Sequence, residues 1–222
     1  SLIKQTPQMI NSKGIPPSKL KNLRNNQIVL ATHNQGKISE INSLLRKYNF
    51  ETISAKELGL IEPIENGSSF EENAFIKASA AARATGLPAL SDDSGLCINV
   101  LDGAPGIYSA DWAGQNKDFN VAIKKVERLM STPSIKDDNA KMFCALCLCW
   151  PNNDFIIKHG EIKGKIVFPP RGEKGFGYDP IFVPNKQPKP NDFLTFGEVE
   201  PEFKNNNCHR SNAFKKLISS IL

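Results

Sequence analysis

QIVLATHNQGKISEINSLLRKYN, the stretch at residues 27–49, holds a short β-branched run, a polar turn and an amphipathic segment in that order. The run at 27–32 is typical of a buried strand, and the turn at 33–36 ends it. Apolar residues then recur at helical spacing, namely Ile38, Ile41, Leu44 and Leu45. The stretch therefore predicts a strand, a loop and a helix, the repeating unit of an α/β fold.

The alternation of strands and helices continues along the chain. Ser69 lies three residues before Glu72, a capping-box spacing that predicts a helix beginning near Phe70. LPALSDDSGLCINVL at 87–101 predicts two short strands that flank an acidic turn at 91–95. Beyond it we predict helices at 120–130 and 211–222, strands at 141–150 and 156–168, and a Gly- and Pro-rich stretch at 169–184. This order indicates an α/β domain with a mixed central β-sheet flanked by helices.

The charged residues are unevenly distributed along the 222-residue chain, which carries 28 Lys and Arg against 23 Asp and Glu, a formal net charge of +5. Residues 1–26 hold five of the basic side chains and no acidic one, so residues 27–222 are formally neutral. We therefore expect 1–26 to be a basic extension outside the fold and 27–222 to be the folded domain. The extension leaves a nucleic-acid-binding module open as an alternative, but the neutral domain makes a nucleic-acid partner a weak expectation.

The composition excludes several classes of protein. With 40% apolar and 23% charged residues, the chain is neither collagen-like nor disordered. It has no apolar run of the roughly 18–20 residues that a membrane span needs, and its polar N-terminus lacks the apolar block of a signal peptide. Five cysteines are too few for a disulfide scaffold and odd in number, which favours a reducing compartment. We therefore expect a cytoplasmic protein with no membrane partner.

Three of the cysteines lie in the predicted strand at 141–150. Alternation places Cys147 and Cys149 on one face of that strand and Cys144 on the other. A zinc site is disfavoured, because no second cysteine pair lies at a usable spacing.

The turn between the first strand and the first helix is a candidate anion site. Free backbone N–H groups and the positive end of a helix dipole favour an anion there, and Lys37 adds a full charge. The turn is not a Walker A loop, because Ala31 stands at the first glycine position and Ile38 follows the lysine. An ordinary polar turn with a solvated lysine is the alternative. The candidate binding residues are Thr32, His33, Asn34, Gln35, Gly36 and Lys37.

Adjacent carboxylates make a candidate metal site. Asp92 and Asp93 repel one another, so a divalent cation would best keep both ionised, and hard oxygen ligands suit Mg²⁺. Glu65, in the preceding loop, offers a further oxygen ligand, whereas helix capping already explains an acid at Glu72. A plain acidic turn is the alternative interpretation.

Two segments in the C-terminal half are candidates to bind the rest of a ligand. Phe176 and Tyr178 lie among glycines at 174–180, so a flat ligand can stack on an aromatic ring with close approach of the backbone. Three hydrogen-bond donors gather further along the chain, namely Lys204, His209 and Arg210. The alternative for 174–180 is a hairpin interrupted by glycines, and the alternative for the three donors is a solvated surface.

Taken in order, these segments resemble the inosine triphosphate pyrophosphatase family, the Ham1/RdgB-like pyrophosphatases of non-canonical purine nucleoside triphosphates. The matching motifs are ATHNQGKISE, FEENAFIKA, LPALSDDSGL, LDGAPGIYSADWAG, GFGYDPIF and Lys204 ahead of His209-Arg210. The chain departs from the family pattern at His33, where the family usually has Gly, and at Cys208 and Ser211, which flank the His-Arg pair. A Maf-like nucleotide pyrophosphatase of other base specificity is the alternative, which the GFGYDPIF and His-Arg segments disfavour.

The resemblance implies a mixed sheet in two lobes with an active-site cleft between them, a homodimer, and Mg²⁺-dependent hydrolysis of ITP, dITP and XTP to the monophosphate and pyrophosphate. The implied catalytic residues are Lys37 and Asp93, with Asp93 as the acceptor of a proton from the attacking water. The implied metal ligands are Glu65 and Asp93, with Glu72 and Asp92 as lesser candidates. The implied substrate-binding residues are Thr32, His33, Asn34, Gln35, Gly36, Lys37, Ser94, Phe176, Gly177, Tyr178, Asp179, Lys204, His209 and Arg210.

The choice of base follows from hydrogen-bond donors and acceptors. Hypoxanthine and xanthine carry an oxygen at position 6, where adenine carries an amino group. Donors at Lys204, His209 and Arg210 would bind the oxygen and would leave adenine facing unmatched donors. Phe176 or Tyr178 would stack on the purine.

Overall fold

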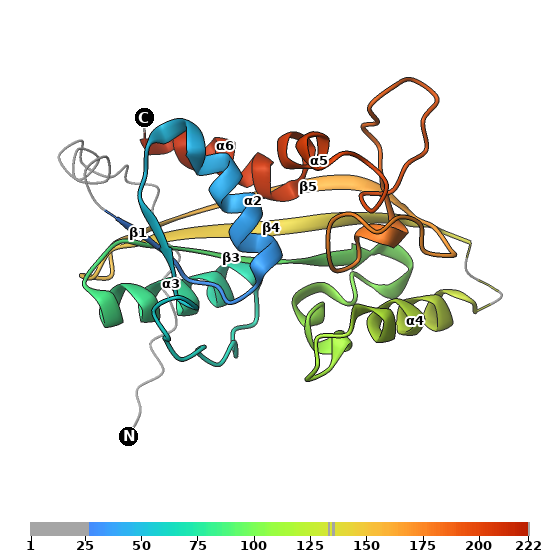
Figure 1. Cartoon of the computed structure of the whole chain (residues 1–222). Helices are drawn as coiled ribbons and strands as arrows, with labels where there is room; N and C mark the ends of the chain where they lie inside the picture. The colour runs from blue at the N-terminus through green and yellow to red at the C-terminus, as the bar shows by residue number, and fades with distance from the viewer. Residues whose placement is uncertain (1–26, 133, 135, 222) are drawn as a thin grey trace.

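The computed structural model describes residues 27–221 except 133 and 135, and these form a six-stranded β-sheet (Figure 1). The strands are β1 (Ile28–Leu30), β2 (Thr52–Ser54), β3 (Ala89–Ile98), β4 (Asn139–Cys149), β5 (Phe155–Ile166) and β6 (Phe182–Pro184). Their order is β2-β1-β3-β4-β5-β6; β1 runs parallel to β2 and β3, and the other neighbours are antiparallel. The predicted mixed sheet is confirmed, whereas the extension predicted at 1–26 lies outside the described residues.

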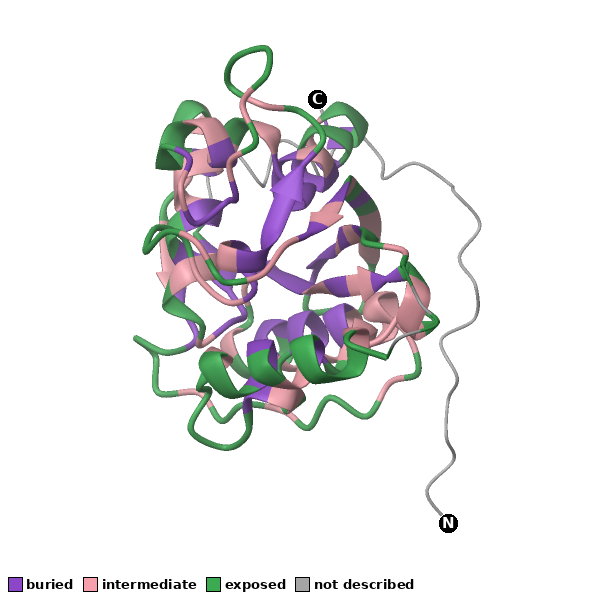
Figure 2. Cartoon of the chain, turned by 90° about the vertical axis from the view of Figure 1, so that its right-hand side faces the viewer, coloured by how far each residue is buried: buried purple, intermediate pink, exposed green. Residues whose placement is uncertain are grey.

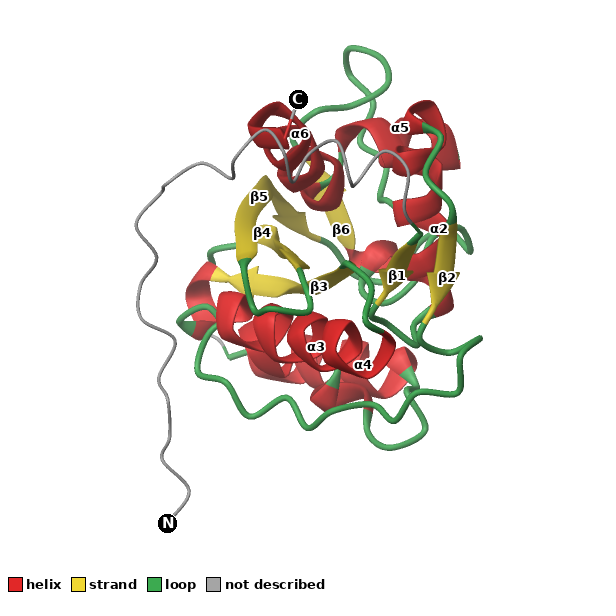
Figure 3. Ribbon diagram, turned by 90° about the vertical axis from the view of Figure 1, so that its left-hand side faces the viewer, coloured by secondary structure: helices red, strands yellow, loops and turns green. Residues whose placement is uncertain are grey.

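Helices cover both faces of the sheet (Figure 3). They are α2 (Gln35–Leu45), α3 (Phe70–Thr85), α4 (Phe119–Met130), α5 (Pro201–Asn207) and α6 (His209–Ile221). α3 and α4 lie on one face, and α2, α5 and α6 lie on the other. α3 packs against β3 and β4, and α6 packs against β4 and β5. None of the described helices is both long and apolar enough to cross a membrane.

The long strands β3, β4 and β5 run through two lobes (Figure 1). In one lobe the core lies on both faces of the sheet, with Cys144 in the cluster under α6 and Cys147 and Cys149 in the cluster under α3, so the predicted alternation is confirmed. In the other lobe a third cluster joins α4 and β6 through residues such as Val126 and Phe182. Figure 2 shows the buried positions along the strands and on the inner faces of the helices.

The segment at 87–101 contains one continuous strand, so the prediction of two short strands around an acidic turn is wrong. β3 pairs with β4 along the whole length of β3, from Ala89 to Ile98. The backbone of Asp92 and Asp93 therefore forms hydrogen bonds of the sheet and does not turn. Neighbouring side chains of a strand point to opposite faces of the sheet. Asp92 and Asp93 therefore face different helices and do not share a turn.

The local predictions for the first two helices are confirmed. Asn34 caps α2, because its side-chain oxygen accepts a hydrogen bond from Lys37 N at 3.1 Å. Ser69 caps α3 in the same way by accepting from Glu72 N at 3.1 Å. The short elements β2, β6 and α5 were not predicted, since none is long enough to show a clear hydrophobic period.

Candidate active site

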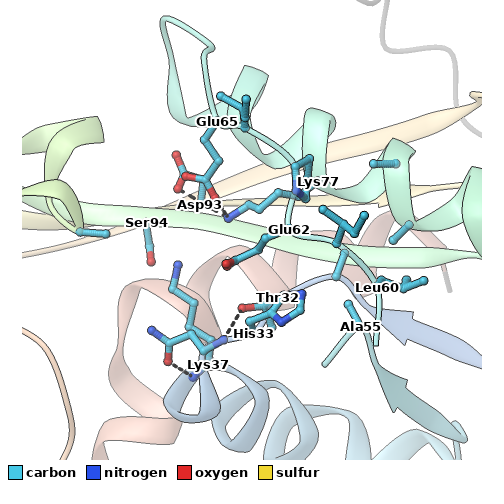
Figure 4. Close-up of a pocket in the computed structure, with 18 of the residues that line it drawn as sticks. Thr32, His33, Lys37, Ala55, Leu60, Glu62, Glu65, Lys77, Asp93 and Ser94 are labelled. Atoms are coloured by element: carbon cyan, nitrogen blue, oxygen red, sulfur yellow. Dashed lines mark hydrogen bonds and ion pairs between the residues drawn. The ribbon is translucent and has the colours of Figure 1, made fainter. Parts of the chain in front are cut away.

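The end of β1 and the start of α2 form one wall of a cavity of about 1050 Å³ (Figure 4). The loop between them is ordered by Thr32, whose Oγ1 accepts a hydrogen bond from Asn34 N at 3.1 Å. The predicted loop residues that line the cavity are Thr32, His33, Asn34 and Lys37. Gln35 and Gly36 begin α2 and are not among the lining residues. The N-terminus of α2 therefore faces the cavity, which is the position that an anion site at this turn would need.

Gly36 is required where α2 meets the second lobe. A Cβ atom at this position would lie 2.5 Å from Cδ1 of Phe176, which is closer than real atoms approach. The missing side chain therefore lets the Phe176 ring lie directly against the first turn of α2. This contact places an aromatic ring beside the predicted anion loop.

Glu65 and Asp93 come together around Lys77 of α3 (Figure 4). Lys77 Nζ lies 2.8 Å from Glu65 Oε1 and 3.8 Å from Asp93 Oδ1. It also donates a hydrogen bond to the carbonyl oxygen of Asp92 at 2.5 Å. Asp93 Oδ2 is buried and has no hydrogen-bond partner among the described residues. Both carboxylates line the cavity, and a cation or a water that reached this unpaired oxygen would satisfy it.

Sequence reasoning missed Lys77. The residue lies on the buried stripe of α3 with Ala74, Ala78 and Ala81, so a charged residue on an apolar helix face was the available signal. Burial acts against the charged form of Lys77, but the carboxylates of Asp93 and Glu65 outweigh burial and raise its pKa. Lys77 therefore stays a cation inside the site.

The surroundings of Asp93 raise its pKa to about 6. Burial is the largest cause, and it outweighs the opposing effect of the Lys77 ammonium. A carboxyl group with a pKa near neutrality is suited to accept a proton at physiological pH.

Asp92 and Glu72, the lesser metal candidates, have other partners. Asp92 faces the opposite side of the sheet, where Lys37 Nζ lies 3.0 Å from Oδ1 and Arg210 Nη2 lies 2.9 Å from Oδ2. Although burial acts against the charged form, Lys37 and Arg210 hold the pKa of Asp92 well below its usual range. Glu72 Oε2 accepts a hydrogen bond from Ser68 N at 2.8 Å, at the start of α3. Neither carboxylate lines the larger cavity.

A smaller cavity of about 90 Å³ adjoins the first and reaches toward the second lobe. Both cavities are lined by Asn34, Lys37, Ser94, Ala110 and Phe119. The smaller one is also lined by the C-terminal candidates Phe176, Gly177, Tyr178, Asp179, Lys204, His209 and Arg210. The structure therefore brings the predicted anion loop and the predicted base-binding residues to adjacent cavities with shared walls.

The basic residues of the smaller cavity belong to a buried ion-pair network around Glu40 of α2. Lys204 Nζ lies 2.6 Å from both Glu40 Oε1 and Asp179 Oδ2. Arg210 pairs with Glu40 Oε2 and with Asp92. All five side chains are buried, so the alternative of a solvated surface is wrong. Glu40 was not predicted, and its place one turn after the anion loop was the only signal for it.

Most of the donors in this network are already used. Arg210 directs four of its five N–H groups to Asp92, Glu40 and Ser94. Lys204 directs two of its three N–H groups to carboxylates. Each side chain therefore keeps one N–H without a partner among the described residues.

Phe176, rather than Tyr178, presents a ring for stacking. The Tyr178 hydroxyl donates to the Ser109 carbonyl oxygen at 2.6 Å, and its ring packs edge-on against Phe119 with the ring centroids 5.3 Å apart. Phe176 is partly exposed in the smaller cavity, and Lys204 Nζ lies 4.4 Å from its ring centroid. Tyr178 therefore supports the cavity wall, and Phe176 faces the ligand space.

His209 is buried in the same cavity and is neutral. Burial is the main cause that lowers its pKa well below the ordinary value, and the nearby Arg210 and Lys204 act in the same direction. Its Nδ1 atom has no hydrogen-bond partner among the described residues. A neutral imidazole offers one donor and one acceptor, so His209 can pair with a group of either kind.

Comparisons with known proteins point to one family. A model of the Ham1 family matches residues 28–220. A dITP/XTP pyrophosphatase of Caulobacter vibrioides is 49% identical over 195 residues, which cover 88% of this chain and 97% of that protein. A dITP/XTP pyrophosphatase of Zymomonas mobilis is 46% identical over 205 residues, which cover 92% of this chain and 96% of that protein. The structure of a HAM1 protein from Coxiella burnetii matches with a TM-score of 0.76 and 40% identity, and covers 87% of this chain and 96% of its own.

Proposed function

The chain belongs to the Ham1 family, and we propose that it hydrolyses the non-canonical purine nucleotides ITP, dITP and XTP to the monophosphate and pyrophosphate. One observation carries the proposal: the cavity beside the carboxylates shares its walls with a pocket that holds an aromatic ring and buried donors. This division suits a nucleotide, whose triphosphate would lie in the larger space and whose purine would lie against the residues of the smaller one.

The start of α2 would hold the phosphates. Its free backbone N–H groups and the positive end of its dipole favour phosphate oxygens. Lys37 lines both cavities, and Asp92 holds its ammonium from behind at 3.0 Å. Lys37 would therefore neutralise charge that develops on the phosphates during the reaction, which is its catalytic role in this proposal.

The cavity fits Mg²⁺. Its charged lining consists of four carboxylates, Glu62, Glu65, Asp93 and Asp111, against three lysines, Lys37, Lys77 and Lys117. A triphosphate adds further negative charge, so a divalent cation favours binding. Two carboxylates leave most of the coordination positions of Mg²⁺ to substrate phosphates and waters, the arrangement that Mg²⁺ commonly has beside nucleotides. Glu65 and Asp93 would hold Mg²⁺, which would neutralise phosphate charge and increase the acidity of a bound water.

Asp93 is the proton acceptor in this proposal. β3 holds its carboxylate at the cavity, and Oδ2 has no hydrogen-bond partner among the described residues, so it would accept one from a bound water. With a pKa of about 6, the group is ionised at neutral pH and remains basic enough to take a proton. The water oxygen then bonds to the α-phosphorus, the bond to the bridging oxygen breaks, and pyrophosphate leaves.

The smaller cavity would select the base. Phe176 offers a ring for stacking, and the remaining N–H groups of Lys204 and Arg210 favour an oxygen at position 6 of the purine. The amino group of adenine would leave these buried donors unpaired, which is costly. Their ion pairs with Glu40 hold both cations in place before the base arrives.

Pyrophosphate release tests the proposal. We would compare ITP, dITP, XTP, ATP, GTP, dUTP and dTTP in the presence of Mg²⁺. The inosine and xanthine nucleotides should turn over fastest. Equal or faster turnover of dUTP or dTTP would instead support the Maf-like alternative.

We also propose that the protein acts in the cytoplasm as a homodimer. All five cysteines are free in the structure, which supports a reducing compartment. The homodimer rests on the family resemblance. Light scattering after size-exclusion chromatography would test it, and a monomer mass at micromolar concentration would overturn it.

A further inference from the structure

Lys77 occupies the space between the two carboxylates that would hold the metal. Its ammonium lies 2.8 Å from Glu65 Oε1 and 3.8 Å from Asp93 Oδ1. The Lys77 side chain is only 7% exposed, and a hydrogen bond to the Asp92 carbonyl oxygen at 2.5 Å holds it against β3. A cation of the protein itself therefore offsets part of the negative charge of the carboxylate pair.

We propose that Lys77 is a built-in competitor of the metal. The Lys77 ammonium and Mg²⁺ bind the same carboxylate pair in turn, and Lys77 moves to a phosphate oxygen of the substrate when the metal takes its place. This inference rests on the proposed function, because it assumes that a nucleotide and a divalent cation enter the cavity together.

The two carboxylates differ in a way that suits an exchange of cations. The Asp93 side chain is 8% exposed and is held by the pairing of β3 with β4. The Glu65 side chain is 37% exposed and lies at 55–69, which contains no helix or strand. Glu65 is therefore the partner that can leave Lys77, while Asp93 keeps its position.

The Lys77 ammonium is close enough to the larger cavity to contact a phosphate bound there. Its side chain lines the larger cavity together with that of Lys37. Its backbone is fixed in α3, but a lysine carries its charge on four flexible methylene groups. A small movement of the ammonium away from Glu65 therefore keeps it inside the cavity.

The competition couples metal and nucleotide binding. As long as the Lys77 ammonium lies between the two carboxylates, a divalent cation that enters alone must displace it and leave it without a partner. A nucleotide supplies a new partner for Lys77 and new oxygen ligands for the metal, so each ligand should strengthen the binding of the other by the same factor. If Lys77 only tied α3 to β3, the nucleotide would act through its own oxygen ligands alone, and replacing Lys77 would not tighten metal binding in the absence of nucleotide.

Mn²⁺ binding, measured by electron paramagnetic resonance, tests the proposal without activity as the readout. In the protein without nucleotide, Lys77→Gln should bind Mn²⁺ about tenfold or more tightly than wild type, because a positive charge next to the ion is lost. Lys77→Arg keeps the charge and should bind Mn²⁺ as weakly as wild type. Unchanged or weaker Mn²⁺ binding by Lys77→Gln would overturn the proposal.

The matched control is Lys141→Gln, which removes a lysine from a surface pair with Glu161, where both side chains are 40% exposed and 3.0 Å apart. It should leave Mn²⁺ affinity unchanged; a gain like that of Lys77→Gln would overturn the proposal by showing a general charge effect.

Wild-type protein alone provides a second measurement if the Lys77 variants do not fold. Its Mn²⁺ affinity should rise about tenfold or more when a non-hydrolysable imido analogue of ITP is present. Equal affinity with and without the analogue would overturn the competition. If wild type hydrolyses ITP but shows no coupling, only this inference fails; if it does not hydrolyse ITP, the proposed function fails.

Discussion

Asp93→Asn is expected to stop turnover and, at the same time, to stabilise the metal-free protein. The pKa of Asp93 rises from 3.8 to about 6 in the folded state, so folding is opposed by the ionised carboxylate. A shift of about two pKa units corresponds to about 3 kcal/mol. Asparagine keeps the shape and removes the charge. The free energy of unfolding should therefore rise by up to about 3 kcal/mol at pH 8.

The size of this gain depends on pH in a defined direction. Well below pH 3.8 the carboxyl group is protonated in both the folded and the unfolded state, so it does not change the free energy of unfolding. Between 3.8 and about 6 only the unfolded state ionises, so wild type loses stability relative to the variant as pH rises. Above about 6 both states ionise and the difference is constant. At pH 5 the gain should therefore shrink to about 2 kcal/mol.

Urea unfolding in the presence of EDTA, at pH 5 and at pH 8, measures this difference. The matched control is Asp111→Asn, which changes an exposed carboxylate of the same cavity and should alter stability by less than about 0.5 kcal/mol. If Asp93→Asn is less stable than wild type at pH 8, or if its gain is the same at both pH values, burial does not raise the pKa of Asp93 as described. Substantial ITP turnover by the same variant would remove Asp93 from the role of proton acceptor.

Three further changes test other parts of the site. Gly36→Ala should lower kcat/KM for ITP about tenfold or more, because a Cβ atom would displace the Phe176 ring; wild-type kinetics would contradict the close contact. Arg210→Ala should lower the free energy of unfolding by about 3–5 kcal/mol, because it leaves the Asp92 and Glu40 carboxylates buried without their partner; a loss below about 1 kcal/mol in urea unfolding would speak against the network. Removal of divalent cations with EDTA should abolish pyrophosphate release from ITP and added Mg²⁺ should restore it, whereas persistent turnover in EDTA would exclude a required metal.

Several features could be predicted from the sequence because the contacts that define them are local. The strand, loop and helix at 27–49 follow from a change of hydrophobic period, and the Asn34 and Ser69 caps act within three residues. The alternation of the cysteines in β4 needs only the period of a strand. The gathering of Lys204 and Arg210 was visible as well, although their burial was not.

The tertiary structure decided what the charged residues do. Asp92 and Asp93 are adjacent in the sequence, but pairing with β4 keeps β3 extended and sends their side chains to opposite faces, one toward Arg210 and the other toward Lys77. Glu40 gains its role from partners far along the chain in the same way. A buried charge is stable only beside the partner that folding brings within about 3–4 Å, and a sequence does not show which distant residue that will be.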